Sequence, residues 1–154
     1  MSNIDIQWRE ATDADIPLLA GMNARLIQDE GHQNPMNPAQ LEQRMRNWLT
    51  GQYTAVIFEN QRKPVAYALY RPADDGWGGD GVYLRQFFVE RDLRRSGIGR
   101  SAIELMRNEV WSKGTRVTLE TLVHNQTAQE FFKSVGFREY CISFELRGGD
   151  KSLT

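Results

Sequence analysis

The sequence has little of what marks secreted, membrane-spanning or nucleic-acid-binding proteins. It contains one cysteine in 154 residues, Cys141, which excludes a disulfide within the chain and favours a reducing compartment. No apolar run approaches the roughly 20 residues that a membrane span needs. The net charge of −1 gives no overall attraction to nucleic acid or to a membrane surface. The polar N-terminus does not resemble a signal peptide, so we expect a cytoplasmic protein that binds neither nucleic acid nor membrane.

The composition is that of an ordinary globular domain, with 40% hydrophobic and 25% charged residues. A chain of this length forms one domain with a core of its own. We therefore predict a single domain over residues 1–147, followed by a disordered tail over 148–154. Cys141 falls in an alternating segment that reads as a strand, so we expect its thiol to be buried and unreactive.

Hydrophobic periodicity predicts strands and helices along the whole domain. The predicted strands cover residues 4–8, 53–59, 64–71, 82–90 and 115–123, with one or two more over 137–146. The predicted helices cover residues 12–30, 39–50, 98–111 and 127–135, and residues 72–81 are predicted to form a mobile loop. This order predicts an α/β domain with a mixed, mostly antiparallel central sheet of six to seven strands, flanked by about four helices.

A glycine-rich basic turn lies between an apolar strand end and a helix. Its sequence is Arg94-Arg95-Ser96-Gly97-Ile98-Gly99-Arg100. The first N–H groups of a helix have no partner within the helix, and the helix dipole adds partial positive charge there. Gly97 and Gly99 lack a Cβ, so the backbone can approach a phosphate closely. The turn is therefore predicted to bind a pyrophosphate.

Two common phosphate motifs fit this turn poorly. A P-loop requires a lysine followed by serine or threonine after its last glycine, whereas Arg100-Ser101 follows here. A dinucleotide fingerprint requires three glycines, and the turn has two.

The turn has the form Arg-x-x-Gly-x-Gly after a strand that ends at Val89, and so resembles the acetyl-coenzyme A loop of the GNAT superfamily of N-acetyltransferases. A second motif, from Asn125 to Gly136-Phe137 with an aromatic pair between, resembles the other signature of that superfamily. A weaker similarity covers residues 8–15. The resemblance implies an enzyme that moves an acetyl group from acetyl-CoA to a primary amine.

The resemblance also implies where acetyl-CoA binds. Two neighbouring parallel strands of the superfamily splay apart, and pantetheine lies in the gap, where it pairs with exposed backbone groups as an added strand would. The residues implied for the strand end and the pyrophosphate are Phe87, Phe88, Val89, Arg94, Arg95, Ser96, Gly97, Ile98, Gly99, Arg100 and Ser101. Asn125 and Phe132 are implied beside the pantetheine arm. No metal is expected.

Glu120 is the best candidate for a general base, because it lies on the strand that would flank the gap, five residues before Asn125. His124 also titrates near neutrality but is expected at the surface. Many superfamily members carry at the position of Phe132 a tyrosine that protonates the departing thiolate. Phenylalanine has no hydroxyl, so Tyr140 or Tyr83 would replace it, or solvent would.

The acceptor is predicted to lie near Glu30, Trp77 and Arg85. Glu30 suits a cationic amine and Arg85 suits a carboxylate, so aminoglycosides, polyamines and amino-acid-like amines all stay open. A protein N-terminus or lysine is an alternative acceptor. A non-catalytic module that binds or senses acyl-CoA is the alternative from another class, and Phe132 favours it. The resemblance makes a homodimer a further expectation.

Overall fold

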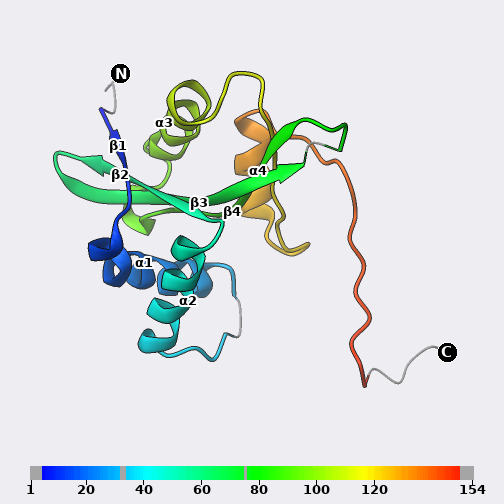
Figure 1. Cartoon of the computed structure of the whole chain (residues 1–154), viewed down its shortest axis with the longest axis horizontal. Helices are drawn as coiled ribbons and strands as arrows, with labels where there is room; N and C mark the ends of the chain where they lie inside the picture. The colour runs from blue at the N-terminus through cyan, green and yellow to red at the C-terminus, as the bar shows by residue number, and fades with distance from the viewer. Residues whose placement is uncertain (1–4, 32–33, 75, 150–154) are drawn as a thin grey trace.

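A five-stranded sheet with helices on both faces forms the body of the molecule in the computed structural model (Figure 1). The structure describes residues 5–31, 34–74 and 76–149, and the end of the predicted tail lies outside these ranges. The strands are β1 (Gln7–Glu10), β2 (Thr54–Asn60), β3 (Lys63–Asp74), β4 (Asp80–Val89) and β5 (Arg116–Thr118). The helices are η1 (Asp13–Asp15), α1 (Ile16–Asp29), α2 (Pro38–Thr50), η2 (Arg91–Leu93), α3 (Ile98–Leu105), η3 (Met106–Val110) and α4 (Gln126–Ser134).

The strands follow the order β1-β2-β3-β4-β5, antiparallel as far as β4 and parallel between β4 and β5. The α/β class and the mixed, mostly antiparallel sheet are thus confirmed, but six to seven strands is wrong. The predicted loop 72–81 is wrong at both ends, because β3 and β4 stay paired out to Asp74 and Asp80. None of the helices in the described ranges combines the length and apolar character needed to cross a bilayer.

The missing strands belong to the segment after α4. Figure 1 shows this segment running away from the sheet toward the C-terminus. The alternating side chains Tyr140, Ile142, Phe144 and Leu146 are 72–92% exposed, and Cys141 is exposed as well, so its predicted burial is wrong. Alternation gives a segment strand character, but a strand forms only where a sheet edge pairs with it. Residues 138–147 pair with no described edge.

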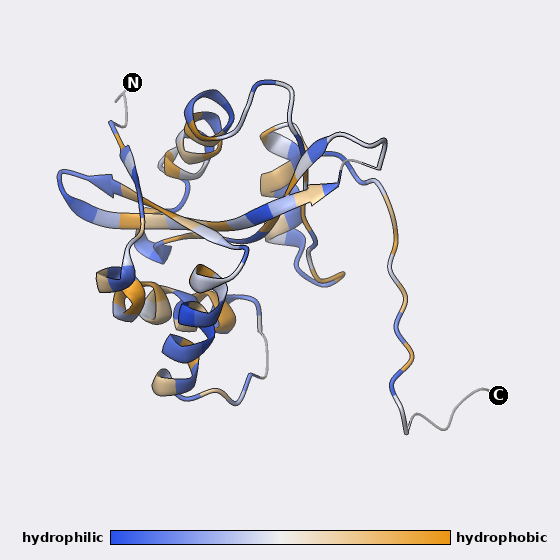
Figure 2. Cartoon of the chain, in the orientation of Figure 1, coloured by the Kyte–Doolittle hydropathy of each residue, from blue (hydrophilic) through white to orange (hydrophobic). Residues whose placement is uncertain are grey.

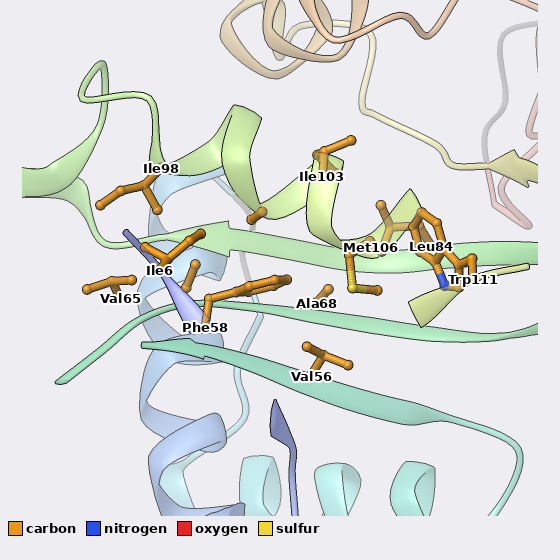
Figure 3. Packing of buried hydrophobic residues seen from close by; sticks show 12 residues of the cluster. Ile6, Val56, Phe58, Val65, Ala68, Leu84, Ile98, Ile103, Met106 and Trp111 are labelled. Atoms are coloured by element: carbon orange, nitrogen blue, oxygen red, sulfur yellow. The ribbon is translucent and has the colours of Figure 1, made fainter. Parts of the chain in front are cut away.

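Two apolar clusters pack on opposite faces of the sheet. One contains Phe58, Leu84, Ile103 and Met106 between the sheet and α3 (Figure 3). The other packs α1 and α2 against Tyr67 and Phe88. Figure 2 shows the corresponding alternation of apolar and polar residues along the helices. Leu84 and Phe88 of β4 belong to the clusters on opposite faces of the sheet. β4 is therefore packed on both faces.

A charge pair joins β1 to the start of α1. The Arg9 guanidinium donates two hydrogen bonds of 2.8 Å to Asp15, which also accepts one from Thr12 N–H. These bonds lower the pKa of Asp15 to about 2. A lowered carboxyl pKa adds stability that is complete above the unfolded-state pKa near 4 and is lost as the pH falls through 2.

We expect unfolding free energy to fall by about 1–2 kcal/mol between pH 6 and pH 2 through this group, a value reduced because Arg9 is partly exposed. Denaturant unfolding at both pH values measures it. The variant Asp15→Asn should lose stability at pH 6 and show a flatter pH dependence. The exposed neighbour Asp13→Asn is the control; equal pH slopes for the wild type and Asp15→Asn would contradict the assignment.

Gly99, near the start of α3, has a packing requirement. A Cβ at this position would lie 2.8 Å from Cε1 of Phe131 on α4, and that ring is stacked on Phe87. Gly99→Ala is therefore expected to destabilise the fold by about 1–3 kcal/mol. Gly21 in α1 is the matched control, because its nearest contact would be 3.8 Å away; Gly21→Ala should stabilise by about 0.5–1 kcal/mol. Thermal unfolding of both variants tests the contrast, and two shifts of the same sign would refute it.

Candidate active site

β4 and β5 part from each other at the β5 edge of the sheet. They pair only between Gly81–Tyr83 and Arg116–Thr118, whereas β4 continues to Val89. A bulge lies just past the last pair, because Leu69 pairs with Gln86 and Tyr70 with Leu84, which leaves Arg85 without a partner. Bulges re-aim side chains and change the exposure of the backbone. The edge of β4 beyond Tyr83 is therefore not paired with β5, and can take an extended ligand.

The start of α3 follows β4 after η2 and the glycine-rich turn, and it differs from the starts of α2 and α4. The Asn37 and Asn125 side chains cap α2 and α4 by accepting hydrogen bonds from Gln40 N–H and Ala128 N–H. The cap residue of α3 is Gly97, which has no side chain and a φ of +90°. Its first N–H groups thus have no side-chain acceptor, and an anion suits them. Arg95 also has a positive φ, of +63°, a conformation that occurs in backbone turns whose successive N–H groups bind anions.

The arginines of the turn are held by neighbouring elements. Arg94 donates to the Val89 carbonyl at 3.0 Å and pairs with Asp29 at the end of α1. Arg91 pairs with the same carboxylate at 2.9 Å. Arg100 donates to the Ser134 carbonyl at the end of α4 at 2.8 Å. The turn is thereby tied to both α1 and α4.

Smaller groups complete the turn. The Ser96 hydroxyl donates to the Leu93 carbonyl, and Ser101 N–H donates the first helical bond of α3, to Gly97. Ile98 is buried in the core cluster under α3. The predicted glycine-rich turn therefore has the backbone of an anion site, while its role with a pyrophosphate stays a prediction.

The predicted pantetheine wall is aromatic. Phe87 stacks on Phe131 at 5.7 Å, and Phe132 meets Phe87, Phe131 and Phe137 edge-on. Phe88 points to the other face of the sheet, into the cluster under α1, so only its backbone can face the gap. Phe132 thus acts as a packing residue between α4 and β4.

The clearest candidate for proton transfer is the pair formed by Tyr83 and Glu120. The Tyr83 hydroxyl donates to Glu120 Oε1 at 2.8 Å, where β4 and β5 separate. Burial, and then the hydrogen bond to Glu120, raise the pKa of Tyr83 to about 12. The phenol thus keeps its proton throughout the neutral range, and Glu120 is exposed beside it. This pair can accept a proton from an amine and hold one near a departing thiolate.

The other predicted residues lie at varying distances from this pair. Tyr140 is exposed, and the Arg116 guanidinium of β5 lies 4.5 Å from the centre of its ring. Trp77 is 92% exposed at the tip of the β3–β4 hairpin, away from Arg85. His124 Nε2 lies 3.4 Å from the Glu30 carbonyl, so the segment before α4 meets the end of α1.

Arg85 lies among residues that sequence reasoning did not select. Its guanidinium lies 5.0 Å from the Trp48 ring centre and donates to the Tyr53 hydroxyl at 3.3 Å. The guanidinium of Arg44, which lies on α2 with Trp48, is 4.5 Å from the centre of the same ring. The spacing of Arg44 and Trp48, four residues apart on a predicted helix, is a signal that would have placed them on one face. Their meeting with Arg85 depends on tertiary packing.

The strand fork, the uncapped start of α3 and the proton-accepting pair can be compared with known proteins. A model of the Acetyltransferase (GNAT) family matches residues 22–137. The chain belongs to this family. The match includes both the glycine-rich turn and α4. It therefore confirms the resemblance that the two sequence motifs indicate.

Two curated relatives match this GNAT chain over about half of its length. Thialysine N-epsilon-acetyltransferase of Bos taurus is 28% identical over 89 residues, 53% of this chain and 52% of the relative. The Sus scrofa protein of the same name is 30% identical over 76 residues, 49% of this chain and 45% of the relative. The matched region thus spans about half the length of these curated relatives.

Solved structures share the fold of this GNAT chain. A possible acetyltransferase from Clostridium difficile 630 has a TM-score of 0.78 and 18% identity, covering 93% of this chain and 97% of the other. An aminoglycoside N-acetyltransferase in complex with CoA has a TM-score of 0.74 and 15% identity, covering 96% and 97%. At these identities the likeness establishes the fold alone.

Proposed function

We propose that this chain transfers the acetyl group of acetyl-CoA to a primary amine of a small molecule. The observation that carries the proposal is the Tyr83–Glu120 pair at the place where β4 and β5 part. The family fold indicates the type of cofactor. Acetylation of an amine needs a proton acceptor in addition, and Glu120 at the fork would provide it.

The backbone and the turn would bind acetyl-CoA. The unpaired edge of β4 from Leu84 to Val89 would pair with the amide groups of the pantetheine arm. The N–H groups from Arg95 to Gly99 would receive the pyrophosphate, with Arg94 and Arg100 adjacent. The structure of an aminoglycoside N-acetyltransferase with CoA and one of a predicted acetyltransferase with acetyl-CoA support this type of ligand.

Glu120 would act on the acceptor amine. An alkyl ammonium ion has no free electron pair with which to attack a carbonyl. The Glu120 carboxylate would remove one proton from it, directly or through one water. The amine nitrogen then bonds to the acetyl carbon as the carbon–sulfur bond breaks, and the nitrogen releases a second proton to solvent or to the departing thiolate. The thiolate, with a pKa near 8.5, takes a proton from solvent or from the protein, so the loss of a tyrosine at Phe132 need not stop the reaction.

A panel of amines tests this proposal by release of free thiol from acetyl-CoA. The panel contains an aminoglycoside, a polyamine, lysine, and a peptide with a free N-terminus and a lysine. Turnover with a small molecule, and little with the peptide, is expected. Turnover confined to the peptide would favour a protein acetyltransferase.

The same panel of amines tests the alternative that the chain is a non-catalytic acyl-CoA sensor. Tight binding of acetyl-CoA with no turnover on any amine would support that reading. The variant Phe132→Tyr is a further test, because a gain in rate with a phenol-dependent pH profile would mean that the site is catalytic and lacks only its acid.

The expected homodimer and cytoplasmic location are further proposals. The exposed apolar side chains of residues 140–146 favour burial against another surface. Light scattering during gel filtration gives the molar mass, and a value of one chain would remove the dimer from the account.

A further inference from the structure

Two arginines lie over the ring of one tryptophan on the α2 side of the sheet. The guanidinium carbons of Arg44 and Arg85 lie 4.5 and 5.0 Å from the centre of the Trp48 ring. Arg85 is also 5.8 Å from the Tyr53 ring. Burial, and then the charge of Arg85, lower the pKa of Arg44, so the two guanidinium groups repel each other, and an anion that contacts both would relieve that repulsion.

No acidic side chain of the described ranges forms an ion pair with either arginine. Other arginines of the chain do have carboxylate partners; Asp29, for example, pairs with both Arg91 and Arg94. The positive charge of Arg44 and Arg85 is thus not neutralised by an ion pair within the described residues.

Buried polar atoms beside the arginines point to a ligand as well. Arg44 donates to Asn23 Oδ1 at 2.8 Å, which fixes its guanidinium against α1. The Nε of Arg44 is buried as well and has no hydrogen-bond partner among the described residues. Buried donors without acceptors cost stability, so natural proteins keep them mainly where something else satisfies them.

The arginine pair is connected to the reaction centre through β4. Arg85 is the bulged residue of the strand, two residues after Tyr83, whose hydroxyl binds Glu120. The charge of Arg85 acts on the Tyr83 hydroxyl, so the two lie on one side of the site. The site therefore has a proton acceptor at one end and two cations at the other.

We propose that Arg44 and Arg85 bind a carboxylate of the acceptor, so that the acceptor is an amino acid or a similar amine that carries a carboxylate. Planar guanidinium groups match the two oxygens of a carboxylate, and both of these groups lie over the Trp48 ring. A polycationic acceptor would meet the same arginines with like charge and would be excluded. This inference rests on the proposed function, because it names the acceptor class of that reaction.

Matched acceptors that differ only in a carboxylate test the proposal. The pairs are lysine with 1,5-diaminopentane, ornithine with 1,4-diaminobutane, and phenylalanine with 2-phenylethylamine. We expect kcat/KM to favour the acid at least tenfold in each pair that is acetylated. Arg85→Gln and Arg44→Gln should reduce that preference at least tenfold, mainly through KM. Arg46→Gln, on the exposed side of α2, is the matched control and should leave it unchanged. Equal or better turnover of the amines without a carboxylate would overturn the proposal.

A binding measurement separates this proposal from the proposed function. Succinate, a simple dicarboxylate, is expected to change the tryptophan fluorescence of the acetyl-CoA-saturated protein, and the change should vanish in Trp48→Phe. The dissociation constant should rise at least tenfold in Arg85→Gln. Succinate binding without acetylation of any amine would leave the anion site standing and remove the proposed function. No response to succinate, with polyamines acetylated, would do the reverse.

Discussion

Gly97→Val is expected to lower the affinity for acetyl-CoA at least tenfold while the protein stays folded. Gly97 caps α3 with a φ of +90°, which a β-branched residue adopts only with strain. The new side chain would also cover the N–H groups at the start of α3, where the pyrophosphate is proposed to bind. Calorimetric titration gives the dissociation constant, and circular dichroism shows whether the fold persists.

Gly114→Val is the matched control for that substitution. Gly114 also has a positive φ, of +82°, but lies in the turn before β5 with nothing within 4 Å of a Cβ. It should carry the same backbone strain and leave the affinity for acetyl-CoA unchanged. Equal losses of affinity in the two variants would mean that strain, and not the phosphate site, is responsible.

Glu120→Gln is expected to reduce turnover about a hundredfold near neutral pH. The amide keeps the shape of the side chain but cannot accept the proton of the acceptor ammonium ion. The loss should shrink as the pH rises toward the pKa of the amine, because the free amine is then present without a base. A pH–rate profile of kcat/KM with the preferred amine measures this.

Two further variants show whether the effect belongs to the carboxylate at the fork. Glu104→Gln, exposed on α3, should behave as the wild type. Tyr83→Phe keeps Glu120 but removes its 2.8 Å hydrogen bond, and should lower turnover without changing the profile below pH 10, because the pKa of Tyr83 is about 12. A Glu120→Gln profile parallel to that of the wild type would remove Glu120 as the base.

Local patterns predicted most of the elements that carry the site. The apolar stripe of α1, the strands β2 to β4, the turn at Gly97 and the helix from Ile98 all follow from periodicity and turn chemistry, which act over a few residues. The glycine at 97 was expected to allow a positive φ and has one. Gly99 was expected to make room for a phosphate, whereas its closest neighbour is the Phe131 ring.

The features that failed depend on partners far along the chain. The strand character of residues 137–146 is local, but the sheet edge that would pair with it is not, so these residues lie outside the sheet. The placement of Arg44 beside Arg85 joins α2 to β4, 41 positions apart in the printed sequence. Sequence spacing alone contains no signal for such contacts.

Calorimetric titration of the wild-type protein with acetyl-CoA, with free CoA alongside, tests the central claim most directly. The account predicts saturable binding of one acetyl-CoA per chain, which places the cofactor before any acceptor is sought. No binding of either ligand to the folded protein would contradict the reading of the β4–β5 fork and the α3 turn as a cofactor site, and with it the proposed acetyl transfer.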